Sequence, residues 1–300
     1  MCLYDCIIVG GGIAGLQAAI QLGRYQHKVL VIDGEMGRST LCRSYHNILG
    51  YPNGVSGSEL RAIGKKQAED LGILFEKAMV IKAEKQNGKF TVETDANKRY
   101  MAKRLLLATG IVDTIPPFAN LFPCLGISVY VCPDCDGYEV KGKKTVVIGS
   151  GNVGANMALT LTYWTRELLY INHGGEKVDA SLLNRLKEQN IPYINKRIAE
   201  VEAQDSQLTG YILEDAIRIE TNKSFLAFGG NKVKSALASQ LGVKLMENRH
   251  IETNSRTKET NIQHVFAAGD VAVHSEQVTI AMGEGSQAAI WIHKSLLEER

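Results

Sequence analysis

The chain has 300 residues, of which 45% are hydrophobic and 22% are charged, a composition typical of a globular protein with about two domains. Its 34 basic and 32 acidic residues nearly cancel, so the charge balance gives no electrostatic case for binding nucleic acid or an anionic membrane. The N-terminus has neither a basic region nor a cleavage-site pattern, so we expect no signal peptide and a cytoplasmic protein.

The chain opens with a predicted strand, a glycine-rich turn and a predicted helix. Residues 4–9 form the apolar strand, and the turn that follows has the G-x-G-x-x-G pattern of Gly10, Gly12 and Gly15. Such glycines allow a tight turn, close approach of the backbone to a pyrophosphate and close helix–strand packing. A second strand ends at Asp33, roughly 20 residues after the turn, where a carboxylate can bind a ribose. This order of elements predicts a dinucleotide site.

The same pattern recurs in the middle of the chain. A buried strand over 105–110 ends in a small-residue turn, and the Pro-Pro pair that follows predicts an interdomain linker. A second βαβ unit is then predicted. Its strands are 144–148 and 168–171, its turn contains Gly149, Gly151 and Gly154, and its helix spans 153–163. Strands are also expected near 225–230 and 265–270, and a long helix over 278–297.

Two cysteines lie just upstream of the second glycine-rich turn, in Cys132-Pro133-Asp134-Cys135. This spacing keeps both sulfurs within bonding reach and can lower the pKa of a thiol. Thiol–disulfide exchange needs an attacking thiolate and a second thiol that resolves the mixed disulfide. Zinc is a second choice, because no other Cys or His pair follows at metal-ligand spacing, so we expect no metal. The pair between two nucleotide sites predicts electron transfer between a flavin and a disulfide.

These motifs together resemble the low-molecular-weight thioredoxin reductases, which are FAD-containing disulfide oxidoreductases. The resemblance covers nearly the whole chain, and its most specific part is Cys132-Pro133-Asp134-Cys135-Asp136-Gly137. It implies an α/β fold with two Rossmann-like three-layer domains: a discontinuous FAD domain, residues 1–113 and 234–300, and an NAD(P)-binding-like domain, residues 114–233, that carries the cysteine pair. Such enzymes are usually homodimers.

The resemblance also implies roles for individual residues. Cys135 would face the flavin, Cys132 would exchange with the substrate, and Asp136 would transfer a proton, although a helix cap or turn residue is the other reading of Asp136. A histidine, His274, could lie near the flavin, but an ordinary surface or core histidine is the preferred interpretation. Besides Gly10, Gly12, Gly15 and Asp33, the implied FAD-binding residues are Asn47, Thr109, Gly110, Gly269, Asp270, Gln277 and Val278. Gly149, Gly151 and Gly154 would be the candidate NAD(P)-binding residues.

The second nucleotide domain departs from the family pattern. NADPH-dependent members carry His-Arg-Arg after its second strand, where arginine suits the 2′-phosphate, but here the stretch is His173-Gly174-Gly175-Glu176. The position that matches Asp33 is Asn172, so the carboxylate expected for NADH is also missing, unless Glu176 replaces it. We therefore expect weak NADPH binding unless Lys177 or another base compensates, and the choice between NADPH and NADH stays open.

Several functions remain open at this point. The leading hypothesis is an FAD-dependent reductase of thioredoxin or a similar small disulfide. The alternatives are a flavin-dependent dithiol oxidase that uses oxygen, a ferredoxin-fed reductase, and a non-catalytic redox-sensing flavoprotein.

Overall fold

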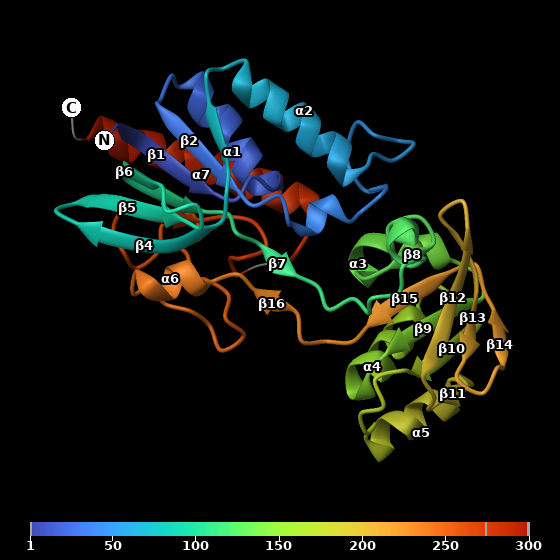
Figure 1. Ribbon diagram of the computed structural model, residues 1–300. Helices are drawn as coiled ribbons and strands as arrows, with labels where there is room; N and C mark the ends of the chain where they lie inside the picture. The colour runs from blue at the N-terminus through green and yellow to red at the C-terminus, as the bar shows by residue number, and fades with distance from the viewer. Residues whose placement is uncertain (1, 274, 299–300) are drawn as a thin grey trace. The chain divides into compact units, whose positions relative to one another are not determined.

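The structure of the protein is a computed structural model that describes residues 2–273 and 275–298 (Figure 1). The chain forms two compact units that alternate along the sequence. The first contains Met1–Thr40, Gly57–Val112 and Lys232–Arg300, and the second contains Leu41–Ser56 and Asp113–Asn231. None of the helices in the described residues combines the length and the apolar character that crossing a membrane requires.

The first unit is built on a sheet with strand order β3-β2-β1-β6-β5-β4, in which β17 pairs with the C-terminal half of β6. Strands β1, β2, β3, β6 and β17 are parallel, and β4, β5 and β6 form an antiparallel meander. The strands are β1 (Leu3–Val9), β2 (Val29–Asp33), β3 (Leu74–Lys77), β4 (Val80–Gln86), β5 (Lys89–Thr94), β6 (Arg99–Leu107) and β17 (Val265–Ala267). The other elements are α1 (Ile13–Arg24), α2 (Gly57–Glu69), α6 (Ala236–Gln240), α7 (Val278–Leu297), the 3₁₀ helix η1 (Arg38–Thr40), and a two-stranded ribbon of β7 (Ile111–Val112) and β16 (Lys232–Val233).

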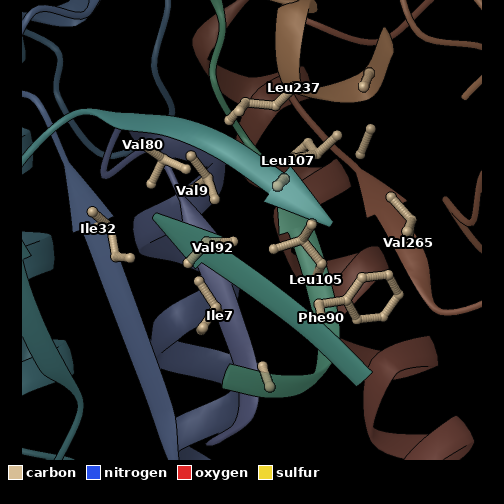
Figure 2. Close-up of a cluster of buried hydrophobic side chains, with 14 of the residues drawn as sticks. Ile7, Val9, Ile32, Val80, Phe90, Val92, Leu105, Leu107, Leu237 and Val265 are labelled. Atoms are coloured by element: carbon tan, nitrogen blue, oxygen red, sulfur yellow. The ribbon is translucent and has the colours of Figure 1, made fainter. Parts of the chain in front are cut away.

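Strand β1 is apolar on both faces because both faces of the parallel sheet are covered. Ile7 and Val9 join a core that includes residues of β4, β5 and α6, as Figure 2 shows. Cys6 and Ile8 belong to the opposite core, which α1 and α7 complete. The alternation follows from the two-residue period of a strand, and the coverage explains why β1 is continuously apolar from Cys6 to Val9.

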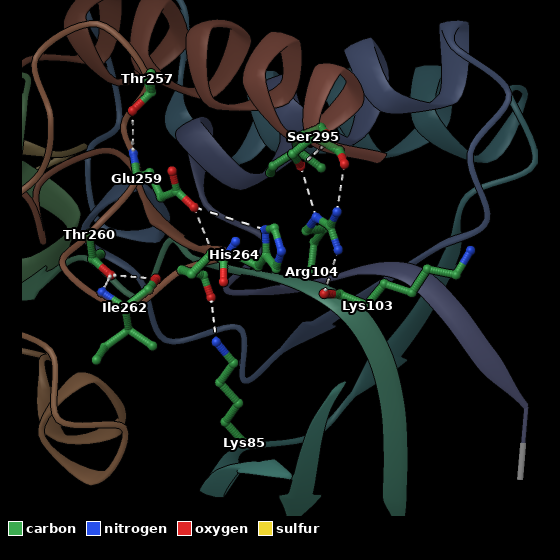
Figure 3. A network of polar contacts seen from close by, with 11 residues as sticks. Lys85, Lys103, Arg104, Thr257, Glu259, Thr260, Ile262, His264 and Ser295 are labelled. Atoms are coloured by element: carbon green, nitrogen blue, oxygen red, sulfur yellow. Dashed lines mark hydrogen bonds and ion pairs between the residues drawn. The ribbon is translucent and has the colours of Figure 1, made fainter. Parts of the chain in front are cut away.

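Small residues allow α1 and α7 to cross closely. A Cβ atom at Gly285 would lie 2.2 Å from the carbonyl oxygen of Ala14, so only glycine fits there. At the other end of α7, the buried Arg104 of β6 donates to the Ser295 hydroxyl at 2.8 Å and to the Ser295 carbonyl at 2.6 Å (Figure 3). These bonds satisfy a fully buried charged side chain and fix α7 on the sheet.

The second unit has a parallel sheet with strand order β11-β10-β9-β15-β8 and an antiparallel sheet with order β12-β13-β14. Helix α4 follows β9 and packs on the parallel sheet, so the strand–turn–helix–strand order predicted for this region is present. The strands are β8 (Val129–Tyr130), β9 (Thr145–Gly149), β10 (Leu168–Asn172), β11 (Tyr193–Ile194), β12 (Ile198–Gln204), β13 (Gln207–Leu213), β14 (Arg218–Glu220) and β15 (Ser224–Ala227). The helices are α3 (Pro133–Asp136), α4 (Gly151–Leu161), α5 (Ala180–Glu188), η2 (Phe122–Cys124) and η3 (Gly137–Val140).

The expected fold class is confirmed, and the segment 41–56 is the main difference in how the chain is divided. The sequence assigned it to the first domain, whereas its contacts group it with the second unit. The Arg43 N–H donates to the carbonyl of Leu125 at 2.9 Å, and Gly126 lies against the Cys42 sulfur. The nucleotide expected in each unit remains a prediction.

Candidate active site

The first glycine-rich turn has the shape that its sequence requires. Gly10 has φ of +105°, and a Cβ atom there would lie 2.3 Å from the Ala108 carbonyl oxygen. A Cβ atom at Gly15 would lie 1.9 Å from the carbonyl oxygen of Gly10. Gly12 precedes the first residue of α1 and differs from both, because no atom lies within 4 Å of a Cβ built on it. The turn is therefore closely packed around Gly10 and Gly15 and open around Gly12 at the N-terminus of α1. A phosphate in that open space can accept hydrogen bonds from backbone N–H groups.

A cavity of about 210 Å³ lies beside this turn, within the first unit. Asp33 borders it at the end of β2, next to Gly11, and accepts a hydrogen bond from Arg61 Nη2 at 2.6 Å. The other terminal nitrogen of Arg61, Nη1, is buried without a hydrogen-bond partner. A buried donor of this kind is costly unless a ligand satisfies it. The open turn, the carboxylate and this orphaned donor fit the adenosine diphosphate half of FAD.

The C-terminal part of the first unit brings Gly269, Asp270, Gln277 and Val278 to the strand and helix ends expected from the sequence. Gly269 and Asp270 follow β17, Gln277 is the N-cap residue of α7, and Val278 is its first residue. The Asp270 carboxylate accepts a hydrogen bond from Arg38 at 3.0 Å. His274 lies outside the described residues.

Arg38 and Glu276 are residues that the sequence analysis did not single out. Arg38 Nη1 lies 2.6 Å from the Glu276 carboxylate as well as 3.0 Å from that of Asp270. This guanidinium therefore holds the segment after β17 against η1. The partners are 232 and 238 residues apart in sequence, so no local pattern reveals the contact.

Glu284 was also missed, although it interrupts the apolar stripe of α7. It is buried, accepts the Gly269 N–H at 3.0 Å, and pairs with Lys258 at 2.7 Å. A buried carboxylate with a charged partner and an N–H donor is stable where an unpaired one is not. Glu284 thus fixes the turn that carries Asp270.

Thr109 and Gly110 form the turn after β6, as predicted. The Thr109 hydroxyl donates to the carbonyl of Lys234 at 2.6 Å, and the Lys234 N–H donates to the carbonyl of Gly110 at 2.9 Å. The turn is therefore tied to the segment that follows β16, within the first unit.

The cysteine pair lies in the second unit and is bonded as a disulfide. Cys132 is the N-cap residue of the short helix α3, and Cys135 lies inside it, with the two Cα atoms 5.3 Å apart. Pro133 occupies the first helical position, where its missing N–H costs nothing. The start of this helix therefore holds the two sulfurs within bonding distance.

Asp136 directly follows Cys135, at the end of α3. Burial, aided by the negative charge of Glu139, raises the pKa of the Asp136 carboxyl to about 7, and the charge of Lys223 opposes the shift. Its side chain makes no capping hydrogen bond to η3, so the helix-cap reading is not supported. A carboxyl that titrates near neutrality can both give and take a proton at physiological pH.

Lys223 and Tyr130 complete the surroundings of α3. The Lys223 ammonium donates to the Ile127 carbonyl at 2.8 Å and to the Tyr130 hydroxyl. Desolvation lowers the pKa of Lys223, and its charge in turn acts on Asp136. Neither residue was predicted. Lys223 comes from the loop before β15, far along the chain from the cysteine pair, and Tyr130 acts here through its contact with Lys223.

A third cysteine of the second unit, Cys42, has a thiol pKa that is too high for a nucleophile. Burial, aided by the nearby charge of Asp136, raises the pKa of its thiol to about 12. Its Sγ donates to the Ser44 carbonyl at 3.4 Å. Because the thiolate is the reactive form, Cys42 stays an unreactive thiol.

Asn47, predicted to contact a flavin, is exposed and lies in the 41–56 segment of the second unit. The other predicted FAD-binding residues belong to the first unit. Among the described residues, no group of three or more His, Cys, Asp or Glu side chains is arranged to hold a metal ion.

The second glycine-rich turn contrasts with the first. The N–H of Gly151 donates to the Asn172 side chain at 3.0 Å, and a Cβ atom at Gly151 would lie 3.0 Å from that of Glu176. Gly149 is closed in by the Ala227 carbonyl and Gly154 by the Tyr170 ring, as close strand–helix packing requires. The predicted turn is present, but its upper side is covered by the chain, so the residues here do not fit a bound pyridine nucleotide.

Comparison with known proteins identifies the family of the chain. A model of the pyridine nucleotide-disulphide oxidoreductase family matches residues 4–285. A thioredoxin reductase of Mycolicibacterium smegmatis is 28% identical over 309 residues, covering 99% of this chain and 98% of the relative. The crystal structure of an oxidoreductase from Agrobacterium tumefaciens superposes with a TM-score of 0.81 at 30% identity, covering 100% of both chains.

The fold itself is shared more widely. The crystal structure of the thioredoxin reductase from Streptococcus pyogenes gives a TM-score of 0.87 at 22% identity, covering 99% of each chain. Members of the matched family use FAD and a nicotinamide cofactor. The chain belongs to the pyridine nucleotide-disulphide oxidoreductases, and within them it is an FAD-dependent oxidoreductase of the low-molecular-weight thioredoxin reductase type.

Proposed function

We propose that the protein reduces a disulfide of thioredoxin or a similar small protein through its Cys132–Cys135 pair. The observation that carries this proposal is the disulfide at the start of α3 with a carboxyl beside it whose pKa is about 7. The names of the relatives support a thioredoxin-like partner. The family resemblance supports a homodimer.

The first unit is the proposed FAD-binding unit. Gly10, Gly12 and Gly15 would leave room for the pyrophosphate at the N-terminus of α1, and Asp33, which borders the adjacent cavity, would bind the adenosine ribose. Thr109, Gly110, Gly269, Asp270, Gln277 and Val278 complete the proposed FAD-binding set, together with Asn47 of the second unit. Bound FAD supplies two-electron chemistry at its isoalloxazine ring.

The exchange step uses only residues of α3. The thiolate of Cys132 attacks one sulfur of the substrate disulfide, the substrate S–S bond breaks, and the other substrate sulfur leaves as a thiolate that takes a proton from solvent. Cys135, as a thiolate once its proton has passed to solvent, then attacks Cys132, which reforms the enzyme disulfide and releases the second substrate sulfur as a thiolate. Asp136 gives this leaving thiolate a proton, since its pKa of about 7 leaves much of it protonated. The substrate gains two electrons, and the enzyme dithiol loses them.

The proposal predicts different defects for the two cysteines. Cys132→Ser should slow anaerobic bleaching of the flavin by dithiothreitol at least about 100-fold, because no enzyme disulfide remains for the dithiothreitol thiolate to attack. Cys135→Ser should instead accumulate a mixed disulfide with a thioredoxin-like substrate, which a non-reducing gel detects. The flavin absorbance of both variants should stay that of the unaltered protein.

Cys2→Ser is the matched control, because Cys2 is an exposed thiol of the first unit. It should leave the bleaching rate unchanged. Unchanged bleaching in Cys132→Ser would contradict the proposal. Bleaching by dithiol that air reverses with peroxide formation would favour a dithiol oxidase, and bleaching by reduced ferredoxin alone would favour a ferredoxin-fed reductase. A redox sensor would show neither oxygen-dependent nor ferredoxin-dependent turnover.

A further inference from the structure

A dinucleotide turn binds pyrophosphate only if its backbone N–H groups are free and if space remains above the second glycine. The first turn of this protein has such space, since nothing lies within 4 Å of a Cβ atom at Gly12. The corresponding glycine of the second turn is Gly151. Its surroundings therefore show whether the second unit can take a pyridine nucleotide.

The N–H of Gly151 is already used. It donates to Oδ1 of Asn172 at 3.0 Å, and the hydroxyl of Tyr170 donates to the Gly151 carbonyl at 2.8 Å. Asn172 is buried and occupies the position where a ribose-binding carboxylate was sought. Its other side-chain atom, Nδ2, donates to the carbonyl of Glu176 at 2.8 Å. One buried amide thus joins the turn to the segment that follows β10.

That segment, residues 174–177, lies over the turn. The Gly174 N–H donates to the Gly149 carbonyl at 3.1 Å. A Cβ atom at Gly151 would lie 3.0 Å from Cβ of Glu176 and 3.3 Å from the carbonyl oxygen of Lys177. The Lys177 carbonyl oxygen belongs to the main chain and the position of the Glu176 Cβ atom is fixed by it, so a change of the Glu176 rotamer alone does not open this space.

The charges near Gly151 and the start of α4 are also unfavourable for a phosphate. A carboxylate oxygen of Glu176 lies 3.3 Å from the same point above Gly151. A second carboxylate, that of Asp179, accepts a hydrogen bond at 2.8 Å from Asn152 in the first turn of α4. Two negative charges at this end of the helix oppose a pyrophosphate electrostatically.

The missing arginines cannot simply be restored. Gly174 stands where NADPH-dependent relatives were expected to carry the first arginine, and a Cβ atom there would lie 2.2 Å from Oγ and 2.4 Å from Cβ of Ser150. Any side chain at this position displaces the segment. The absence of arginine and the closed turn are thus two consequences of one local conformation.

We propose that Asn172 and residues 174–177 close the second nucleotide fold, so that neither NADPH nor NADH delivers electrons to this protein. The inference rests on the proposed function, because it concerns the electron donor of that disulfide oxidoreductase. The second unit then serves as the carrier of the Cys132–Cys135 pair. Electrons enter through a donor that does not use this glycine-rich turn.

The first test is an anaerobic titration of the flavin-loaded protein with NADPH and with NADH. We expect no bleaching and no saturable binding by calorimetry up to about 1 mM of either nucleotide. Saturable binding or rapid bleaching below that concentration overturns the inference. Dithiothreitol is titrated in parallel: if it also fails to bleach the flavin, the proposed disulfide chemistry fails while the nucleotide result still stands.

The second test opens the turn. The double variant Asn172→Ala/Glu176→Ala frees the Gly151 N–H, releases the Glu176 carbonyl from the Asn172 amide and removes one carboxylate, so residues 174–177 can move off the turn. It should bind NADH at least about tenfold more tightly than the control Asn195→Ala/Glu200→Ala, an effect of about 1.4 kcal/mol. Asn195 contacts Asn172 on its other side at 2.9 Å, and Glu200 is an exposed residue of β12, so the control makes the same chemical changes away from Gly151. Equal affinities in the two variants overturn the closure by Asn172 and Glu176. If the opened variant does not fold, the titration of the unaltered protein decides.

Discussion

Asp136 is the residue whose protonation has the clearest consequence for stability. Its carboxyl has a pKa of about 7 in the folded protein, against 3.8 for an unperturbed aspartate, so the folded state binds this proton more tightly. The stabilising contribution is therefore complete below pH 3.8 and is lost as the pH rises through about 7. Above that pH the folded protein carries a half-buried, partly desolvated carboxylate.

Asp136→Asn should remove this pH dependence. We expect the variant to be more stable than the unaltered protein at pH 8, by on the order of 1–3 kcal/mol, and to lose that advantage toward pH 5. Urea unfolding at the two pH values measures the difference, with Asp134→Asn on the exposed side of the same helix as the control. A parallel pH dependence in Asp136→Asn and the unaltered protein would show that the carboxyl titrates normally.

The residues that the sequence identified and those that it missed differ in how they make contact. Gly10, Gly15 and Asp33 could be predicted because a turn and the strands beside it are local in sequence. Arg38 and Glu284 could not, since each acts through a partner from a distant segment brought near only by folding. The sequence showed that arginine was missing after β10, but not that residues 174–177 lie over the glycine-rich turn.

At the scale of the element, substitutions in the first glycine-rich turn distinguish an effect on folding from an effect on cofactor binding. Gly12→Ala should leave the unfolding temperature of the cofactor-free protein nearly unchanged, because no atom lies within 4 Å of the added Cβ. The same methyl group enters the space proposed for the pyrophosphate, so the affinity for FAD should fall at least about tenfold. Fluorescence titration of the cofactor-free protein with FAD measures this.

Gly15→Ala is the contrasting variant on the same turn. Its Cβ atom would lie 1.9 Å from the Gly10 carbonyl oxygen, so it should destabilise even the cofactor-free protein, by about 1–3 kcal/mol. If Gly12→Ala bound FAD as well as the unaltered protein does, the pyrophosphate would not lie over this turn.

The elements that could be predicted from sequence are those with strong apolar periodicity. The helix expected over 278–297 coincides with α7, and both βαβ units have their strands within a few residues of expectation. The antiparallel strands β12, β13 and β14 were not foreseen. Only Ile198 and Val201 of β12 are buried, so its pattern is too short and polar to distinguish a strand from a loop.

At the scale of the whole molecule, each unit has its own hydrophobic cores, although the chain passes between them repeatedly. Two core clusters belong to the first unit and two to the second. The residues proposed to hold FAD lie almost entirely in the first unit. Binding of a ligand stabilises only the structure that unfolds together with its site.

Excess FAD should therefore raise the unfolding temperature of the first unit and leave that of the second unchanged. At a free concentration of 100 times the dissociation constant the stabilisation is about 2.7 kcal/mol. The chain contains two tryptophans, Trp291 in the first unit and Trp164 in the second, so each unit carries one fluorescent probe. Trp164→Phe leaves the first unit observable and Trp291→Phe the second. Equal shifts of the two probes would mean that the units unfold as one or share the cofactor, whereas NADPH, excluded from the closed turn, should shift neither.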